Sequence, residues 1–314
     1  MTARWGFIGA GWIAQRAMGP AVHAASNARL VAVASRDSYR SALLEPDAVL
    51  DSYGAVVADP SIDVVYVCLS NDQHADWVVA ALHAGKHVLC EKPLGCNARD
   101  VERMAAAARE ADRLLVEAVW SRWHPRFRRL AQLVKAGGVG DLESIDSSFT
   151  FPGDIDGNYR ADPAMGGGAL LDVGGYQVHA WVAVAGAGIV VDVDAVEVDR
   201  GPTGVDLTTR AAVTIGGRAR ATLLSSFRMP EMQTLIVTGS DAVARVPAGS
   251  AFTSWREPSE LLVGDRVERF AAVDAYVLMV ESMSARAAGD EAYVVPLEDS
   301  LAVAAIIDRL GAAG

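Results

Sequence analysis

Two separated stretches of this 314-residue chain carry side chains that suit proton transfer at an oxygen atom. The first is Cys90-Glu91-Lys92-Pro93, and the second, Gly166 to Tyr176, contains Asp172. A phenol with an ordinary pKa of about 10 is a poor base at neutral pH. An ammonium group nearby lowers that pKa and favours an alkoxide on a reacting oxygen. We therefore predict that Lys92 and Tyr176 act together as catalytic residues, with Asp172 orienting the phenol or the substrate.

A glycine-rich turn near the N-terminus has the pattern of a dinucleotide-binding loop. The strand-like run Trp5–Ile8 leads into Gly9-Ala10-Gly11-Trp12-Ile13-Ala14, and a helix is expected to about residue 25. Gly9 permits the tight turn, Gly11 lets the backbone approach a pyrophosphate, and Ala14 lets the helix pack closely. Free amides at the helix start would face the phosphates. The predicted cofactor contacts in this loop are Gly9, Gly11, Trp12 and Ile13.

The end of the second predicted strand bears on which dinucleotide binds. After Leu30–Ala34 the chain reads Ser35-Arg36-Asp37, at the place where an acid would bind the ribose 2′-hydroxyl of NAD. A hydroxyl and a guanidinium suit a 2′-phosphate instead, because arginine stacks on adenine and pairs with phosphate oxygens. We predict NADP(H), with Ser35 and Arg36 as contacts; NAD stays open if Asp37 turns inward.

Polar residues follow the next predicted strand. Val64–Leu69 is a nearly continuous apolar run, as expected where both faces of a parallel sheet are covered. It is followed by Ser70, Asn71 and His74, before a helix expected from about residue 75 to 84. Ligands bind at the carboxyl ends of such strands, so these three residues are predicted cofactor contacts, although helix capping explains them almost as well. A short strand, 86–89, then brings Cys90–Pro93 to the same edge.

These motifs together resemble the family of glucose-fructose oxidoreductase, inositol dehydrogenase and the MocA-type proteins. The resemblance rests on the glycine turn, the polar strand end and Gly85-Lys86-His87-Val88-Leu89-Cys90-Glu91-Lys92-Pro93. In that family the Glu-Lys-Pro triplet follows a Rossmann strand, its lysine contacts the substrate and the nicotinamide ribose, and the Lys-Pro bond is often cis. The resemblance implies these contacts for Lys92, and we place Glu91 among the cofactor contacts.

Two further motifs extend the resemblance over nearly the whole chain. The segment Glu117 to Pro125 resembles a signature of the dihydrodiol dehydrogenase and xylose dehydrogenase branch, in which the residues matching Trp120 and Arg122 lie near the nicotinamide and the substrate. Burial at a domain junction explains Trp120 about as well, so Arg122 is the predicted contact. Asp172 and Tyr176, which share one helix face, resemble the family's third motif in its tyrosine form.

The sequence pattern changes near residue 120. Before it, strands alternate with helices, and the last helix is expected over about 98–110. The segment 38–59 is short for the helices that the family usually has there. After a helix over about 125–136, short alternating runs separated by turns indicate an antiparallel sheet. These runs are Leu142–Phe151, Ala211–Ile215, Ala219–Ser225, Thr234–Thr238 and Ala242–Val246, and helices are expected from 169, over 274–288 and over 297–310. We predict an α/β Rossmann dinucleotide-binding domain over 1–120 and an α+β domain for substrate binding and oligomerisation over 121–314, built on a large, mostly antiparallel open sheet.

Composition excludes several classes of partner. The net charge of −11 argues against nucleic acid or an anionic membrane, because both need a basic face. The longest uninterrupted apolar run, Ala180–Val191, is well short of the roughly 20 residues that span a bilayer and is read as buried interior. No signal-peptide pattern is seen at the start. Cys68, Cys90 and Cys96 lack metal-ligand spacing and suit reduced thiols in a cytoplasmic protein without a metal site.

The predicted function is an NADP-dependent oxidoreductase that transfers a hydride between the nicotinamide and a hydroxyl-bearing carbon of a sugar, polyol or cyclic diol. His179 is either an alternative proton carrier or a core histidine. A redox-neutral NAD(P)-dependent glycosidase and a non-catalytic cofactor sensor remain alternatives, although a sensor has no need of Lys92, Asp172 and Tyr176. The resemblance also implies a homodimer or homotetramer formed through the open face of the second domain's sheet.

Overall fold

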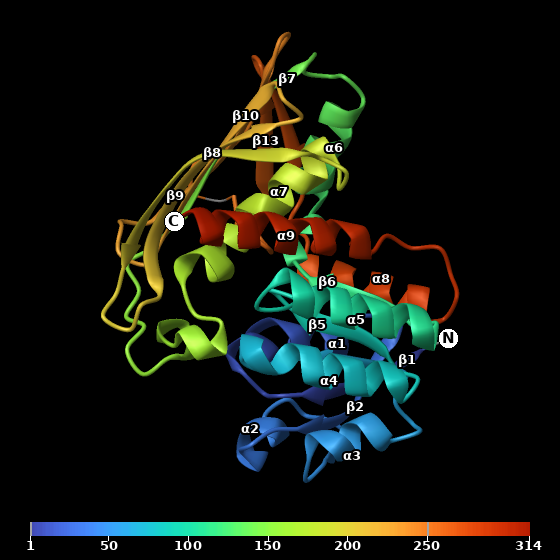
Figure 1. Ribbon diagram of the computed structural model, residues 1–314. Coiled ribbons are helices and arrows are strands. Elements are labelled where there is room, and N and C mark those ends of the chain that lie inside the picture. Colours follow the sequence, from blue (N-terminus) through green and yellow to red (C-terminus); the bar gives the residue numbers. More distant parts are fainter. Residues whose placement is uncertain (1, 250) are drawn as a thin grey trace. The chain divides into compact units, whose positions relative to one another are not determined.

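A computed structural model describes residues 2–249 and 251–314, and the chain divides into two compact units (Figure 1). Unit 1 comprises Met1–Gly95, Arg99–Trp123 and Asp274–Leu297, and unit 2 comprises Cys96–Ala98, His124–Val273 and Glu298–Gly314. The division between Trp123 and His124 falls three residues after the predicted boundary. The segment 274–297 differs more, since the predicted second domain contained it and the packing assigns it to unit 1.

Unit 1 contains a six-stranded parallel sheet with the strand order β3-β2-β1-β4-β5-β6. Its strands are β1 (Ala3–Ile8), β2 (Ala28–Ala34), β3 (Ala48–Val49), β4 (Val64–Val67), β5 (His87–Glu91) and β6 (Leu115–Ala118). This is the Rossmann order, and its direction of growth reverses between β1 and β4. The loops after these two strands therefore meet at the point where such sheets bind dinucleotides, which confirms the predicted fold of this unit.

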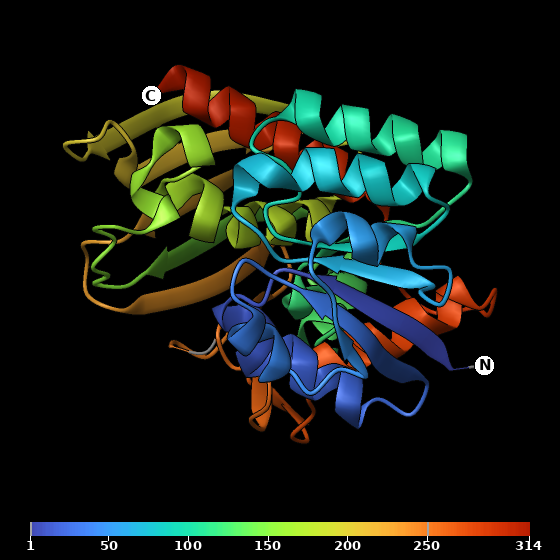
Figure 2. The ribbon, with the colours of Figure 1, turned by 90° about the horizontal axis from the view of Figure 1, so that it is seen from below.

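The helices of unit 1 follow the predicted alternation, with local differences. They are η1 (Ala14–Met18, π-helical), α1 (Gly19–Ala24), α2 (Ser38–Ala42), α3 (Tyr53–Ala58), α4 (Asn71–His83), α5 (Ala98–Ala111), the 3-10 turn η2 (Trp120–Arg122) and α8 (Ala275–Ala287). The stretch 38–59 thus holds two short helices and β3. Figure 2 shows α4 and α5 side by side. Helix α8 packs on α1 and β1, where the Trp5 indole Nε1 donates a buried 3.0 Å hydrogen bond to Ser284 Oγ.

Unit 2 contains an eight-stranded sheet with the order β14-β13-β12-β11-β7-β10-β9-β8. Its strands are β7 (Leu142–Thr150), β8 (Val191–Arg200), β9 (Asp206–Ile215), β10 (Ala219–Ser226), β11 (Met232–Gly239), β12 (Val243–Val246), β13 (Ser259–Val263) and β14 (Arg266–Phe270). Strands β7 and β10 are parallel, and the other neighbouring pairs are antiparallel. The predicted large, mostly antiparallel sheet is confirmed.

The sequence interpretation missed three strands of this sheet, β8, β13 and β14. The run Ala180–Val191, expected to be buried throughout, instead finishes a helix, passes through a turn in which Val190 is 62% exposed, and begins β8. Strand β8 reads Val-Asp-Val-Asp-Ala-Val-Glu-Val-Asp-Arg, an alternation typical of a strand with one face in solvent. The charge pattern was therefore sufficient to find it.

The helical segments of unit 2 include the one on which the predicted acid and phenol lie. They are α6 (Pro125–Lys135), the 3-10 turns η3 (Tyr159–Ala161) and η4 (Pro163–Met165), η5 (Leu170–Gly174, π-helical), α7 (Gly175–Ala185) and α9 (Leu297–Ala313). Helix α7 is buried from Gly175 to Val184 and packs on β7 and α6. Within the described residues, no helix combines the length and apolarity that crossing a membrane requires.

Candidate active site

The glycine turn of unit 1 packs directly against the end of β4. Gly9 has a φ of +94°, and a Cβ built there would lie 2.1 Å from the carbonyl oxygen of Cys68. A Cβ on Gly11 would lie 3.2 Å from the Cys68 Sγ atom. No side chain fits at Gly9, and little room exists for one at Gly11. The backbone of this turn is therefore free of side chains at the edge of the sheet. Of the other predicted contacts in the turn, Trp12 is 66% exposed and Ile13 is half-buried.

In the turn after β2 an arginine is exposed to solvent, and the neighbouring aspartate caps the helix that follows. The Asp37 Oδ1 atom caps α2, accepting from the backbone N–H groups of Tyr39 at 2.9 Å and Arg40 at 3.3 Å. The Ser35 hydroxyl donates to the Asp37 carbonyl oxygen at 2.6 Å. Arg36 is exposed. A capping carboxylate is not turned toward a ribose, so this turn suits a 2′-phosphate better than a 2′-hydroxyl.

The polar cluster after β4 is part of α4, which begins at Asn71 rather than near residue 75. Ser70 precedes the helix without capping it, because its Oγ atom lies 2.7 Å from the Gln73 Nε2 donor. His74 is fully buried, with Nδ1 2.9 Å from the Pro93 carbonyl oxygen and Nε2 3.2 Å from that of Leu69. Burial lowers the pKa of His74. His74 therefore links the segments that follow β4 and β5, and its contact with the cofactor stays a prediction.

A buried carboxylate precedes the predicted catalytic lysine. Tyr66 Oη donates to Glu91 Oε1 at 2.5 Å, and both residues are buried. Burial raises the pKa of Glu91 to about 7, although the Tyr66 hydrogen bond and the Lys92 charge oppose the rise. The Lys92-Pro93 bond is cis, as the resemblance implied. The Glu117 Oε1 atom accepts from the Leu94 backbone N–H at 3.0 Å, so a second buried acid holds the segment after the lysine.

This elevated pKa makes stability depend on pH with a defined sign. The folded state holds a proton on Glu91 up to about pH 7, whereas the unfolded chain releases it near 4.5. The unfolding free energy therefore decreases as pH rises through this interval, by up to about 3 kcal/mol. Replacing Glu91 with Gln should remove this part of the slope when urea unfolding is measured from pH 4.5 to 7.5. The exposed Glu110→Gln control should keep the wild-type slope; equal slopes for wild type and Glu91→Gln would contradict the prediction.

Both residues of the branch signature are buried in η2. Trp120 is 2% exposed and stacks on Tyr276 of α8, with ring centres 6.2 Å apart. Arg122 is 5% exposed in the same turn. This arrangement favours packing as the role of Trp120. Of the two residues, Arg122 stays the predicted contact with the cofactor.

Unit 2 holds the predicted acid against an arginine that the sequence interpretation had not assigned a role. The Arg160 guanidinium pairs with both oxygens of Asp172, Nε to Oδ2 at 2.8 Å and Nη2 to Oδ1 at 3.2 Å. Burial alone would lower the pKa of Arg160, but the Asp172 charge and hydrogen bonds raise it overall. Arg160 lies in a loop twelve residues before its partner, with no periodic pattern to mark the pair.

The glycine run ahead of η5 holds this loop in place. Gly168, with a φ of +114°, donates its N–H to the Arg160 carbonyl oxygen at 3.0 Å, and a Cβ on Gly167 would meet that oxygen at 2.4 Å. The Asp206 Oδ2 atom accepts from the Leu170 backbone N–H at 2.7 Å, which anchors the start of η5. Only glycine combines this backbone conformation with such close packing.

The predicted base lies within an aromatic cluster. Tyr176 is 9% exposed, and its ring centre is 5.8 Å from that of Phe149 and 6.1 Å from that of Phe252. The neighbouring Gln177 fixes α7 to β10 by accepting from the Leu224 backbone N–H at 3.2 Å. The Asp172 charge is the main cause that raises the pKa of Arg160, and a charge on Tyr176 would add a smaller effect in the same direction.

Comparison with known proteins identifies the family. Residues 3–119 match the oxidoreductase family with an NAD-binding Rossmann fold, and residues 127–245 match the GFO/IDH/MocA C-terminal domain. The chain belongs to the GFO/IDH/MocA family. It is 35% identical to D-xylose 1-dehydrogenase (NADP(+)) 2 of Haloferax volcanii, over 98% of this chain and 95% of that protein. It is 34% identical to trans-1,2-dihydrobenzene-1,2-diol dehydrogenase of Mus musculus, over 85% and 80%. The resemblance stated from the motifs, including its branch, is confirmed.

The solved structure of a 3-ketoreductase has the same fold over the whole of this chain. The 3-ketoreductase of Actinomadura kijaniata, crystallised with NADP and TDP-benzene, is 28% identical with a TM-score of 0.90, over 100% of this chain and 98% of that one. A variant of that enzyme with one tyrosine replaced by phenylalanine (TM-score 0.90) and another with one lysine replaced by alanine (0.86) were also crystallised with both ligands. The likeness supports the two-unit architecture of this family member.

Proposed function

We propose that this chain is an NADP-dependent oxidoreductase that transfers a hydride between the nicotinamide and a hydroxyl-bearing carbon of a sugar, polyol or cyclic diol. The observation that carries the proposal is the buried phenol of Tyr176 four residues after the buried, charge-paired carboxylate of Asp172. The named relatives, a xylose dehydrogenase and a dihydrodiol dehydrogenase, support the substrate class.

The residues of unit 1 fit this cofactor. The bare backbone at Gly9 and Gly11 would hold the pyrophosphate, and the exposed Arg36 would pair with the 2′-phosphate. The bound nicotinamide accepts or donates the hydride. The remaining proposed contacts are the amides of Trp12 and Ile13, and Ser35, Ser70, Asn71, Glu91, Lys92 and Arg122.

This chain's own residues would handle the proton. In the oxidation direction Tyr176 removes the hydroxyl proton as the carbon is oxidised, and in reduction it returns it. The Lys92 ammonium favours both the phenolate and the developing alkoxide. Asp172 orients the phenol or the substrate. His179 is 1% exposed in α7, so burial favours a core role for it over that of proton carrier.

The proposal is tested by a turnover screen of aldoses, polyols and cyclic diols with NADP⁺ and NAD⁺ in parallel, following the absorbance of reduced nicotinamide. We expect reduction with one substrate class. Release of a leaving group from glycosides without net nicotinamide reduction would identify the glycosidase alternative. Cofactor binding without either reaction would identify the sensor.

Arg36 should determine the cofactor preference. Replacing it with Ala removes a charge-assisted contact with the 2′-phosphate, worth about 1.5–3 kcal/mol, and should weaken NADPH binding about 10- to 100-fold. NADH binding, which lacks this phosphate, should change little. Fluorescence titrations of both cofactors measure the ratio. Arg40→Ala, an exposed arginine in α2 just after this turn, is the control; equal losses for both cofactors would contradict the assignment.

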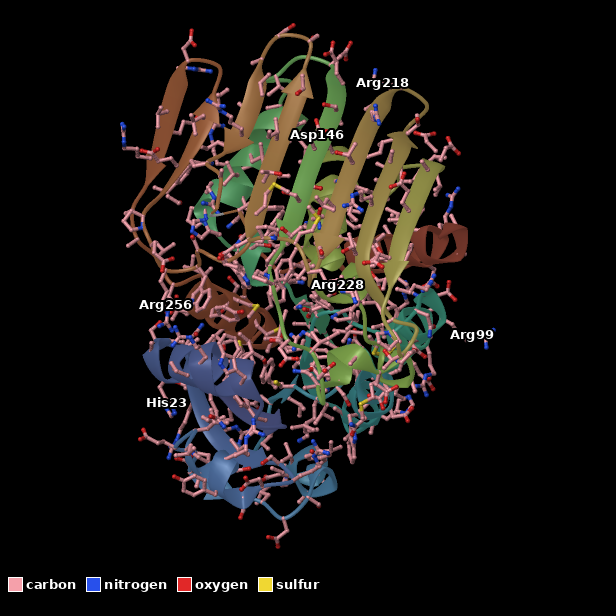
Figure 3. All side chains as sticks on the ribbon, turned by 90° about the vertical axis from the view of Figure 1, so that its left-hand side faces the viewer. His23, Arg99, Asp146, Arg218, Arg228 and Arg256 are labelled. Atoms are coloured by element: carbon pink, nitrogen blue, oxygen red, sulfur yellow. The ribbon has the colours of Figure 1, made fainter. Side chains whose placement is uncertain are left out.

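We further propose that the protein is a cytoplasmic homodimer or homotetramer formed through the open face of the unit 2 sheet. Asp146 lies in the middle of this sheet on β7 (Figure 3), where Thr222 Oγ1 donates to it at 2.7 Å. The half-buried Leu224 and Ile236 lie on the neighbouring strands. Such a face of paired polar groups and apolar side chains suits a self-complementary contact. A monomeric mass in light scattering would contradict it.

A further inference from the structure

We infer that Arg160 is a positioning residue for the Tyr176 phenol: its guanidinium holds Asp172 in one orientation and stabilises the phenolate form of Tyr176. The inference rests on the proposed function in taking Tyr176 as the proton-transfer group. It adds a residue outside the Asp-x-x-x-Tyr motif, from a loop that precedes the motif in the chain.

The pairing between Arg160 and Asp172 restricts the carboxylate. Both oxygens are engaged, at 2.8 and 3.2 Å, by two nitrogens of one planar group. The side chains are 30% and 7% exposed, respectively, so solvent screens the pair only partly. A bidentate contact fixes the plane of the carboxylate as well as its distance, which a single hydrogen bond or a lysine does not do.

Arg160 is itself held in place. Its backbone N–H donates to the Asn158 Oδ1 atom at 3.1 Å, and its carbonyl oxygen accepts from Gly168 at 3.0 Å. Its Cζ atom lies 4.8 Å from the centre of the Tyr159 ring, a cation–π contact. The guanidinium is therefore fixed by the backbone on both sides and by an aromatic ring, and it is oriented before any ligand arrives.

The charge balance around Tyr176 explains why an arginine is needed. Asp172 is one turn away on the same helix, and its negative charge alone would oppose ionisation of the phenol. The rings of Phe149 and Phe252 contribute no charge, and His179 lies further along α7. Arg160 engages both oxygens of Asp172, at 2.8 and 3.2 Å, and so offsets the negative charge that lies one turn before the phenol. It thus neutralises the acid while favouring the phenolate.

The first test measures ionisation without turnover. The protein has seven tyrosines, so the Tyr176 titration is isolated as the difference in absorbance at the tyrosinate band between each background and the same background carrying Tyr176→Phe. Replacing Arg160 with Met should move this titration up by about 1 pH unit or more. An unmoved titration would overturn the inference. Arg160→Gln, which can still donate to Asp172 but carries no charge, replaces Arg160→Met if that variant does not fold.

A matched ion pair in the same unit supplies the control. Arg129 makes the same bidentate contact with Glu268, at 2.7 and 2.8 Å, and joins α6 to β14. Arg129→Met should leave the Tyr176 titration unchanged. An equal shift in this variant would show a general effect of losing an ion pair and would overturn the inference.

The second test uses the pH profile of kcat. Arg160→Met should lower kcat about 100-fold at neutral pH through loss of alignment and of phenolate, with partial recovery as pH rises. Arg160→Lys keeps the positive charge and loses the bidentate guanidinium contact. This variant should titrate Tyr176 at the wild-type pH and should lose part of kcat. Inactivity of the wild-type protein on every substrate would contradict the proposed function and leave the titration test intact. An active wild type with an unshifted Arg160→Met titration would contradict only the role of Arg160.

Discussion

Replacing Tyr176 with Phe is expected to lower kcat by about 10²–10⁴-fold, the range for losing a positioned general base, and to leave cofactor affinity unchanged. The substitution removes one hydroxyl from a ring that packs on Phe149 and Phe252, so the aromatic cluster should stay intact. Steady-state rates with the best substrate of the screen measure kcat. Titration of NADPH fluorescence measures binding, which depends on unit 1.

Tyr53→Phe is the matched control for this prediction. Tyr53 lies on α3 of unit 1 and packs edge-on against Trp77, with ring centres 5.2 Å apart. Its loss of a hydroxyl should leave both kcat and binding at wild-type values. If Tyr176→Phe retained full turnover, proton transfer would have to be assigned to His179 or Lys92 instead, and His179→Asn would then be the variant to measure.

Replacing Lys92 with Met should lower kcat by about 10²–10³-fold, because the ammonium charge is lost where negative charge develops on the reacting oxygen. Methionine keeps the length and apolar part of the side chain. The pH profile should also change, since the phenol loses a cation that favours its ionised form. Rates measured from pH 6 to 10 should therefore recover in part at high pH.

Lys135→Met is the control that separates the local effect of the Lys92 charge from the change in the total charge of the protein. Lys135 is exposed in the last turn of α6, and its replacement alters the total charge by the same amount. This variant should match the wild type. Unchanged turnover in Lys92→Met would remove the lysine from the reaction and would leave Tyr176 without its proposed activating cation.

Contiguous motifs were predictable because each performs its role over a few residues. The turn at Gly9 needs a positive φ, and the sequence Glu91-Lys92-Pro93 directly follows a strand at the sheet edge. The order of strands and helices in unit 1 follows from their alternation along the chain. In unit 2, five of the eight strands could be recognised from period-two patterns, and β8 carried the same signal in its alternating acids.

Partners far apart in the chain were not predictable in the same way. The Tyr66–Glu91 hydrogen bond joins two strands, and the burial that raises the Glu91 pKa has no mark in the local sequence. His74 looked like a ligand because it follows a strand, yet the first turn of α4 directs its ring into the interior. Burial and hydrogen-bond partners decide what a titratable group does, and both are properties of the fold.

The sequence by itself determined the family and the two types of sheet, and it supplied the proposal of the lysine, acid and phenol, since these depend on residue types at short, regular spacings. The tertiary structure decided which groups surround them. It placed Arg160 on Asp172, used Asp37 as a helix cap beside an exposed Arg36, and brought α8 back to β1 through Trp5 and Ser284, 279 residues apart. Charge and burial act through space, and chain folding alone brings such distant residues within their range.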